Sequence, residues 1–265
     1  MTRSFAWVGS WLLQAYYMLF VAFLVLPIFV MILMSFKNSE FLGFPIKGLT
    51  LDWYGAALAD PAILGAVATT AFVAAVSTLI ALVVGTWAAV ALERLQGLAK
   101  AVAFVILCIP LAAPGIISAI SLRIFAFDIG LELGVPAIIM AHTVHAVPFV
   151  SLMVLARLSH LPKSQTEAAK DLGASPITAF CLITLPFLKP SLIGASLFGL
   201  LLSMDDFNRS FFLGGFEPTL PILVFERMST GISPQINAIA SIVLLVTLSM
   251  GFVGERTLRR IGARK

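Results

Sequence analysis

Long apolar segments without charged side chains dominate this sequence. Ile63–Leu92 contains no Asp, Glu, Lys or Arg, and neither does Trp11–Phe36. A helix of about 20 apolar residues crosses a hydrocarbon core of about 30 Å, so each segment is long enough to span a bilayer. Neither segment shows the alternation of apolar and polar residues that marks a membrane β-strand. Because a spanning segment must satisfy its own backbone hydrogen bonds, both segments predict helices.

The composition extends this prediction to the whole chain. Of the 265 residues, 60% are hydrophobic and 11% are charged, too few charges to cover the surface of a soluble domain. We therefore expect an all-α polytopic membrane protein that forms a single transmembrane domain over residues 1–265. The first apolar segment offers no small-residue cleavage site and is interpreted as a retained helix rather than a signal peptide. Six transmembrane helices are predicted, at Trp11–Phe36, Ile63–Leu92, Ala101–Leu122, Leu133–Ala156, Pro190–Leu213 and Ile236–Val253.

The positions of the basic residues predict the orientation. Twelve of the 17 Lys and Arg residues fall on one side of the six predicted helices. Cytoplasmic loops carry the excess of positive charge, so both termini and the loop between the fourth and fifth helices are expected to be cytoplasmic. The twelve residues are Arg3, Arg94, Lys100, Arg157, Lys163, Lys170, Lys189, Arg256, Arg259, Arg260, Arg264 and Lys265.

The loop before the fifth predicted helix shows signals for two short helices. Ser164 and Glu167 have the S-x-x-E spacing of a capping box. Gly173 supplies a left-handed residue that ends the first helix, and Ser175 caps a second one with Pro176 at its first position. A short helix outside the bilayer suits docking into a groove of a partner. Its apolar face would consist of Ala168, Ala169 and Leu172.

The same loop carries the motif of a known family. Glu167-Ala168-Ala169, Gly173 and Ile183-Thr184-Leu185-Pro186 resemble the EAA loop, EAA-x3-G-x9-I-x-L-P, of the permease subunits of bacterial ABC importers. The resemblance implies the type I ABC importer permease fold, with a coupling loop at about residues 160–186. Its contacts with a separate ATPase subunit would be made by Glu167, Ala168, Ala169, Asp171, Leu172 and Gly173.

The family resemblance also implies partners. It implies an ATP-binding cassette ATPase dimer, a second permease subunit in a heterodimer, and a periplasmic solute-binding protein, at a bacterial inner membrane. The sequence leaves open whether the second permease is a copy of this chain. No G-x-x-x-x-G-K-[ST] phosphate loop is present, which agrees with ATP and Mg²⁺ being held by the partner. We therefore expect no enzyme activity, catalytic residue, bound cofactor, metal site or nucleic-acid role for this chain.

Motifs near the C-terminus resemble a subfamily, the second permease of spermidine/putrescine importers. These motifs are Ser203-Met-Asp-Asp-Phe207, Phe211-Phe212, Thr219-Leu-Pro221 and Gly231–Ala238. The resemblance implies a polyamine substrate. Asn208 and Arg209 depart from it, because the subfamily has apolar residues there. A guanidinium repels a cation and suits an amino-acid derivative, an opine or another zwitterion or anion, so this substrate class is the alternative.

The role of Asp205 and Asp206 has two interpretations. If the fifth helix begins near Pro190, Asp205 lies about 22 Å along it, in the outer half of the core, where a carboxylate is expensive unless it faces water or a partner. In one interpretation Asp205, Asp206 and Arg209 line the substrate path. In the other, Asp205 pairs with Arg209 at i, i+4 and only stabilises the end of the helix.

Two further alternatives concern a metal site and the class of transporter. His142 and His145 lie three residues apart, the spacing of a helical metal-ligand pair, but no third ligand is evident, which favours a buried histidine pair. A secondary transporter is the distant alternative to an ABC permease. It would show paired broken helices, and the sequence predicts none.

Overall fold

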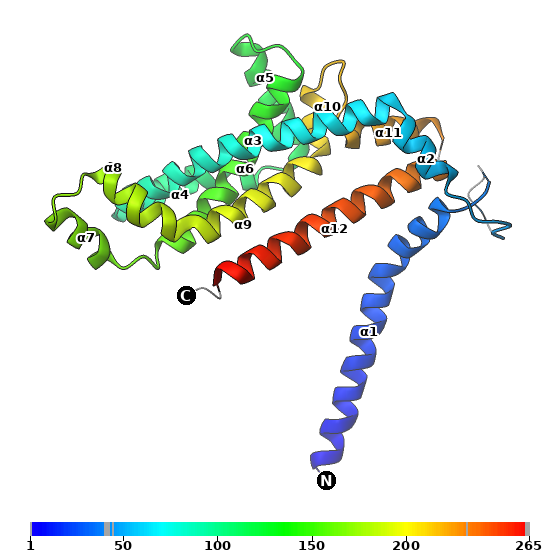
Figure 1. Ribbon diagram of the computed structural model, residues 1–265, viewed down its shortest axis with the longest axis horizontal. Helices are drawn as coiled ribbons and strands as arrows, with labels where there is room; N and C mark the ends of the chain where they lie inside the picture. The colour runs from blue at the N-terminus through cyan, green and yellow to red at the C-terminus, as the bar shows by residue number, and fades with distance from the viewer. Residues whose placement is uncertain (1, 40–42, 44, 232, 263–265) are drawn as a thin grey trace. The chain divides into compact units, whose positions relative to one another are not determined.

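The computed structural model describes residues 2–39, 43, 45–231 and 233–262, and this part of the chain is helical (Figure 1). It contains no strand, only an isolated bridge between Lys37 and Leu49. The all-α prediction is confirmed. The elements are α1 (Thr2–Ser35), α2 (Asp52–Ala59), α3 (Pro61–Arg94), α4 (Gly97–Ala112), α5 (Gly115–Asp128), α6 (Val135–Leu158), α7 (Lys163–Asp171), α8 (Pro176–Ala179), the π-helix η1 (Phe180–Thr184), α9 (Leu185–Met204), α10 (Phe207–Leu213), α11 (Leu220–Thr230) and α12 (Pro234–Gly262).

Five of the described helices are long and apolar enough to cross a membrane, and six do so if α4 and α5 form one bent span. The chain divides into two compact units, Met1–Asp60 with Glu226–Val246 and Pro61–Phe225 with Thr247–Lys265. The last three residues, including Arg264 and Lys265 from the orientation argument, lie outside the described part, and so do the side chains of Arg3, Lys163 and Arg260.

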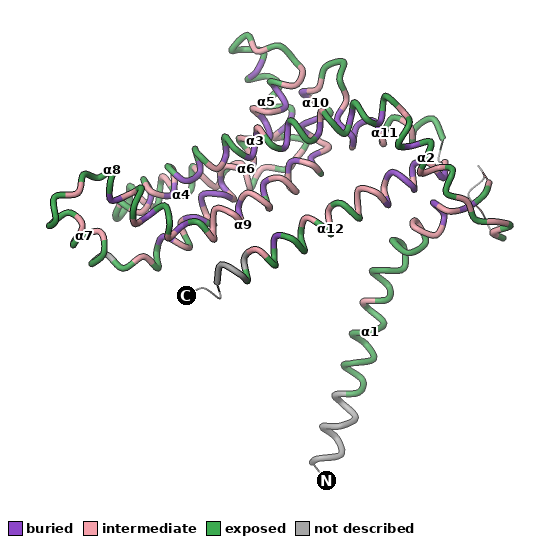
Figure 2. Tube along the Cα trace, in the orientation of Figure 1, coloured by how far each residue is buried: buried purple, intermediate pink, exposed green. Residues whose placement is uncertain are grey.

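In the first unit, polar side chains connect the end of α1 to α2 and connect Asp60 to α11. The Ser35 hydroxyl lies 2.6 Å from the Tyr54 hydroxyl, and the Trp53 indole donates to the Lys37 carbonyl at 2.8 Å. Arg227 pairs with Asp60 at 2.7 Å. Most described side chains of α1 are exposed and apolar (Figure 2), as expected for a helix whose surroundings are lipid or another subunit.

Small residues allow the helices of the second unit to approach closely. α3, α6 and α9 pack against one another, around a buried cluster that includes Ala81, Ala146 and Ala195. A Cβ atom added to Gly85 would lie 2.8 Å from Val150 Cγ1 and 3.1 Å from the Val147 carbonyl oxygen. Within a bilayer such close packing, rather than exclusion of water, drives the association of helices.

The third predicted span is two helices. α4 ends at Ala112, α5 begins at Gly115, and their axes differ in direction by 106°. Proline disfavours the helical conformation in the residue before it, and Ala113 accordingly has extended angles, φ −74° and ψ 129°. The prediction of one helix over Ala101–Leu122 was therefore wrong.

The fifth predicted span begins earlier and ends earlier than expected. The predicted second short helix is present as α8, but it continues without interruption through η1 into α9, so Pro176–Met204 is one helical segment. The π-helix η1 lies where the Pro186 ring would meet the carbonyl four residues earlier. A proline clashes with that carbonyl in a regular α-helix, and a widened turn relieves the clash. The predicted start at Pro190 was therefore too late in the chain, and the predicted end at Leu213 lies beyond the end of α9 at Met204.

Candidate functional site

Two helix breaks meet within the second unit. Asp205 and Asp206 connect α9 to α10, and α10 packs against α5 just after the α4–α5 break. A Cβ atom on Gly115 would lie 2.7 Å from the Asn208 amide nitrogen, and Arg209 donates to the Ser118 hydroxyl at 3.3 Å. In the described part of the chain α4 and α5 are the one bent pair of apolar helices, so a matched pair of broken spans, as in a secondary transporter, is not found there. Broken helices place polar backbone and side chains at membrane depth, where a solute can be contacted.

Arg209 pairs with Asp206, not with Asp205. The Arg209 guanidinium lies 2.7 Å from the Asp206 carboxylate, and the two side chains are 4% and 6% exposed. Asp206 also caps α10, since its carboxylate accepts the Arg209 amide at 3.1 Å. The predicted i, i+4 pair of Asp205 with Arg209 is wrong because α9 ends at Met204. The two residues do not share a helix, and the cap position brings Asp206 over the first turn of α10 instead.

The Asp205 carboxylate is left without a counter-charge. It is exposed, and no described residue makes a hydrogen bond or an ion pair with it. It lines a cavity of about 260 Å³ together with Phe207 and His145. Because Asp206 and Arg209 neutralise each other in the same lining, Asp205 gives the cavity a net negative charge. The cavity therefore has the electrostatic character to accept a cation.

His142 forms hydrogen bonds with residues on both sides of the α9–α10 break. Its Nδ1 lies 2.7 Å from the Ser203 hydroxyl at the end of α9, and its Nε2 lies 3.2 Å from the Ser210 hydroxyl in α10. Ser203 is also 3.3 Å from the Ser77 hydroxyl of α3. Sequence reasoning noted Ser203 only as part of a motif and missed Ser77 and Ser210, although Ser77 is a polar residue deep inside a charge-free apolar segment. We call His142, Ser77, Ser203 and Ser210 the His142 network.

The two histidines therefore have different surroundings. His142 is buried and its ring nitrogens have serine partners, as the buried-histidine interpretation expected. His145 packs edge-on against Phe149, with ring centroids 5.5 Å apart, and its Nδ1 is buried without a hydrogen-bond partner among the described residues. The described residues contain no group of three or more His, Cys, Asp and Glu side chains that could hold a metal ion.

The predicted coupling loop contains the expected first helix, α7, but with a different start. The N-cap of α7 is Pro162, and no side chain caps it. The predicted capping box of Ser164 with Glu167 was wrong, because Lys163 is already helical. Ser164 is then the second residue of the helix, two residues past the N-cap position from which a hydroxyl accepts a free amide.

The end of α7 follows the prediction closely. Gly173 has a positive φ of +83°. Its amide donates to the Lys170 carbonyl, and the Ala174 amide donates to the Ala169 carbonyl at 2.9 Å, the two bonds of a Schellman motif. Ser175 then accepts the Thr178 amide at 3.1 Å, with Pro176 at the first position of α8. These conformations are confirmed.

The predicted contact residues of α7 form an outward-facing surface. Leu172 is 89% exposed and Ile177 of α8 is 75% exposed, so neither apolar side chain is covered by the rest of the chain. Five of the six predicted contact residues are exposed and Ala169 is half-buried. The exposed ones are Glu167, Ala168, Asp171, Leu172 and Gly173.

Comparison with known families supports the resemblance. The family described as binding-protein-dependent transport system inner membrane component matches residues 81–265. The chain belongs to this family. It is thus a permease subunit of an ABC importer and a multi-pass membrane protein.

Two relatives with curated names are polyamine permeases. The putrescine transport system permease protein PotI of Escherichia coli K12 is 35% identical over 240 residues, which cover 87% of this permease and 85% of the relative. The spermidine/putrescine transport system permease protein PotC of Haemophilus influenzae is 29% identical over 248 residues, covering 93% and 96%. These alignments extend over most of each chain.

Solved structures share the fold of the permease. A chain of a bacterial ABC transporter that imports the acidic polysaccharide alginate superimposes with a TM-score of 0.76 at 17% identity, covering 96% of both chains. A chain of the MetNI methionine ABC transporter in an inward-facing conformation gives 0.62 at 25% identity, covering 75% of this permease and 95% of that chain. The permease fold is therefore that of ABC importers.

Proposed function

We propose that this permease moves a polyamine, putrescine or spermidine, across a bacterial inner membrane by alternating access, driven by ATP hydrolysis on partner subunits. The observation that carries the proposal is the unpaired Asp205 carboxylate in its cavity. An ammonium group beside it gains a charge-assisted hydrogen bond. The relatives PotI and PotC, named for putrescine and spermidine transport, support the same substrate class.

The burial of Arg209 removes the main objection to a cationic substrate. A free guanidinium would repel a cation, but this one is 2.7 Å from Asp206 and 4% exposed. Breaking a buried pair by removing one partner is costly, so Arg209 is not available to attract a carboxylate from a substrate. An opine or other anion would meet only the negative charge of Asp205, which weakens the alternative substrate class.

Asp205→Asn should reduce stimulation of ATP hydrolysis by putrescine or spermidine in the reconstituted transporter with its solute-binding protein. The variant keeps the size of the side chain and removes its charge, so we expect the half-maximal polyamine concentration to rise roughly tenfold. Asp128→Asn, an exposed carboxylate at the end of α5 outside this cavity, is the matched control. Unchanged stimulation in Asp205→Asn, or stimulation of the wild type only by zwitterions or anions, would contradict the polyamine proposal.

We further propose that residues 160–186 dock into the ATPase subunit, with both termini on the cytoplasmic side. The exposed apolar side chains of Leu172 and Ile177 support the docking role, because a partner's groove would cover them. A second permease subunit in a heterodimer would complete the pore, and a periplasmic solute-binding protein would deliver the solute. ATP and Mg²⁺ would be held by the ATPase dimer.

Gly173→Val should uncouple the ATPase from the permease while leaving the transmembrane helices inserted. A Cβ atom at Gly173 meets no other atom within 4 Å, so the cost is the left-handed backbone alone, about 1–3 kcal/mol for a β-branched residue. Co-purification of the ATPase and substrate-stimulated hydrolysis would measure the loss. Gly173→Asn, which tolerates the left-handed conformation, should retain both, and Glu167→Lys should lose the ATPase through its reversed charge. Normal coupling in Gly173→Val and Glu167→Lys would contradict the docking role.

A further inference from the structure

A second cavity lies between α7 and the ends of α3 and α6 where these spans meet the coupling loop. Its volume is about 270 Å³, and its lining includes Arg94 of α3, Leu158 of α6 and Lys170 of α7. All of its lining belongs to the second compact unit. The cavity is therefore built partly by the transmembrane helices and partly by the segment proposed to contact the ATPase.

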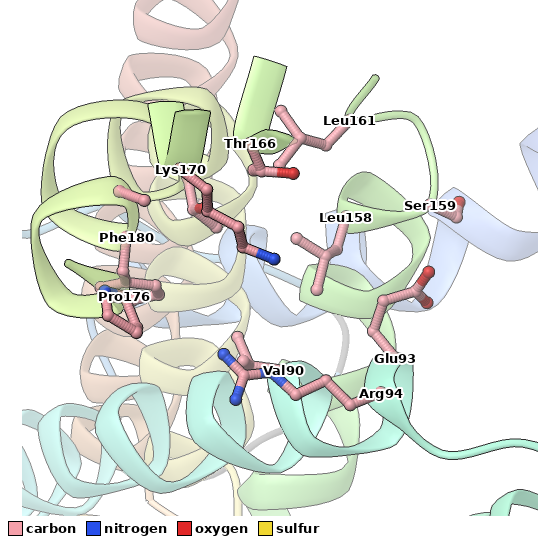
Figure 3. Close-up of a pocket in the computed structure, with 12 residues that line it drawn as sticks. Val90, Glu93, Arg94, Leu158, Ser159, Leu161, Thr166, Lys170, Pro176 and Phe180 are labelled. Carbon is pink, nitrogen blue, oxygen red and sulfur yellow. The ribbon is translucent and has the colours of Figure 1, made fainter. Parts of the chain in front are cut away.

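Two cationic side chains from different helices point into this cavity. Figure 3 shows the Lys170 ammonium group and the Arg94 guanidinium directed into the space between α7 and α3. Neither side chain makes an ion pair or a hydrogen bond with a described residue. The one acidic residue of the lining, Glu93, has its own cation, since Lys100 lies 3.8 Å from its carboxylate. The cavity therefore carries a net positive charge.

The position of the cavity indicates the kind of anion. Glu93 and Arg94 are the first charged residues after the charge-free Ile63–Leu92 segment, so the cavity lies where the apolar span ends and lipid headgroups begin. Val90, Leu158 and Phe180 supply an apolar side to the lining. A guanidinium offers a planar fork and an ammonium a compact point charge, a combination suited to phosphate oxygens.

We propose that this cavity is a binding site for a phosphate group, held between Arg94 and Lys170. The phosphate of an anionic phospholipid headgroup and free inorganic phosphate share this chemistry. A ligand bound to both residues would link α7 to α3 and so restrain the proposed coupling helix. The binding itself does not rest on the proposed function, whereas the effect on coupling does.

The test measures binding in the complete purified transporter, independently of transport. One arm places the transporter in nanodiscs of phosphatidylglycerol or of phosphatidylcholine and quantifies co-retained lipid by native mass spectrometry. The other titrates inorganic phosphate in phosphatidylcholine nanodiscs. In the double variant Arg94→Gln with Lys170→Gln, the amount of co-retained phosphatidylglycerol or the affinity for inorganic phosphate should fall roughly tenfold. Lys189→Gln, an exposed cation at the start of α9 outside the cavity, is the matched control and should bind like the wild type.

The outcomes separate the two sources and the two proposals. If the transporter retains phosphatidylglycerol and only the double variant loses it, the site binds a lipid headgroup. If phosphate binding is saturable and is lost in the double variant, the site binds the free anion. No binding, or an equal loss in Lys189→Gln, would overturn the site. Arg94→Lys with Lys170→Arg keeps both charges and should keep binding, which separates loss of charge from misfolding. If phosphate or lipid binding at this cavity persists but polyamines do not stimulate ATP hydrolysis, the polyamine proposal is contradicted and the phosphate site is not.

Discussion

Arg209→Gln should destabilise the assembled permease by about 3–5 kcal/mol, the cost of leaving a buried charge uncompensated. The substitution removes the guanidinium that lies 2.7 Å from Asp206, a carboxylate whose side chain is 6% exposed. It also removes the hydrogen bond from Arg209 to the Ser118 hydroxyl of α5. Thermal unfolding of the purified transporter in detergent, followed by the monodisperse fraction after heating, would measure the loss.

The double variant Asp206→Asn with Arg209→Gln separates charge from packing. It removes both charges, and asparagine at position 206 can still cap α10 by accepting the amide of residue 209. Most of the stability lost in Arg209→Gln should return, because a buried ion pair contributes little beyond the penalty of breaking it. Equal destabilisation in the single and double variants would show that Asp206 is not held as a buried charge.

Gly85→Val should force α3 and α6 apart. Its Cβ atom would lie 2.8 Å from Val150 Cγ1 and 3.1 Å from the Val147 carbonyl oxygen, so side chain and backbone of α6 would both have to move. Overpacking in a tight core costs about 1–3 kcal/mol, and the backbone contact places this variant at the upper end. The same heating assay would report a lower midpoint, with reduced yield of the assembled transporter.

Gly65→Val on the same helix is the control for the Gly85 prediction. A Cβ atom at Gly65 meets no atom within 4 Å, so this variant carries the same change in helix propensity without the collision. It should unfold close to the wild-type temperature. Similar losses in the two variants would mean that β-branching in α3, rather than the α3–α6 contact, limits stability.

Sequence patterns were sufficient where the structure depends on residues close together in the chain. The charge-free segment Ile63–Leu92 predicted α3, which spans Pro61–Arg94. Gly173 and Ser175 have the conformations that their residue types predicted. Each of these features follows from the local chemistry of the backbone or from the length of an apolar run, so no tertiary contact is needed to find it.

Helix boundaries at prolines were only partly predictable. The predicted helix over Ala101–Leu122 missed the break before Pro114, where the axes of α4 and α5 differ in direction by 106°. The fifth span was expected to begin near Pro190, yet the helix runs through Pro186 and Pro190 after the widened turn η1. Whether a proline ends, bends or merely widens a helix depends on what the neighbouring helices offer to the freed carbonyls.

The sequence by itself determined the membrane class, the helical composition and the motif that marks an importer permease, because these are set by hydropathy and local spacing. Only the tertiary structure decided which charges are paired. It paired Arg209 with Asp206 and left the Asp205 carboxylate in its cavity without a partner among the described residues. It also placed His142 between Ser203 of α9 and Ser210 of α10. Burial and partner distance set the effective charge of a side chain, and both arise from residues distant in the sequence that folding brings together.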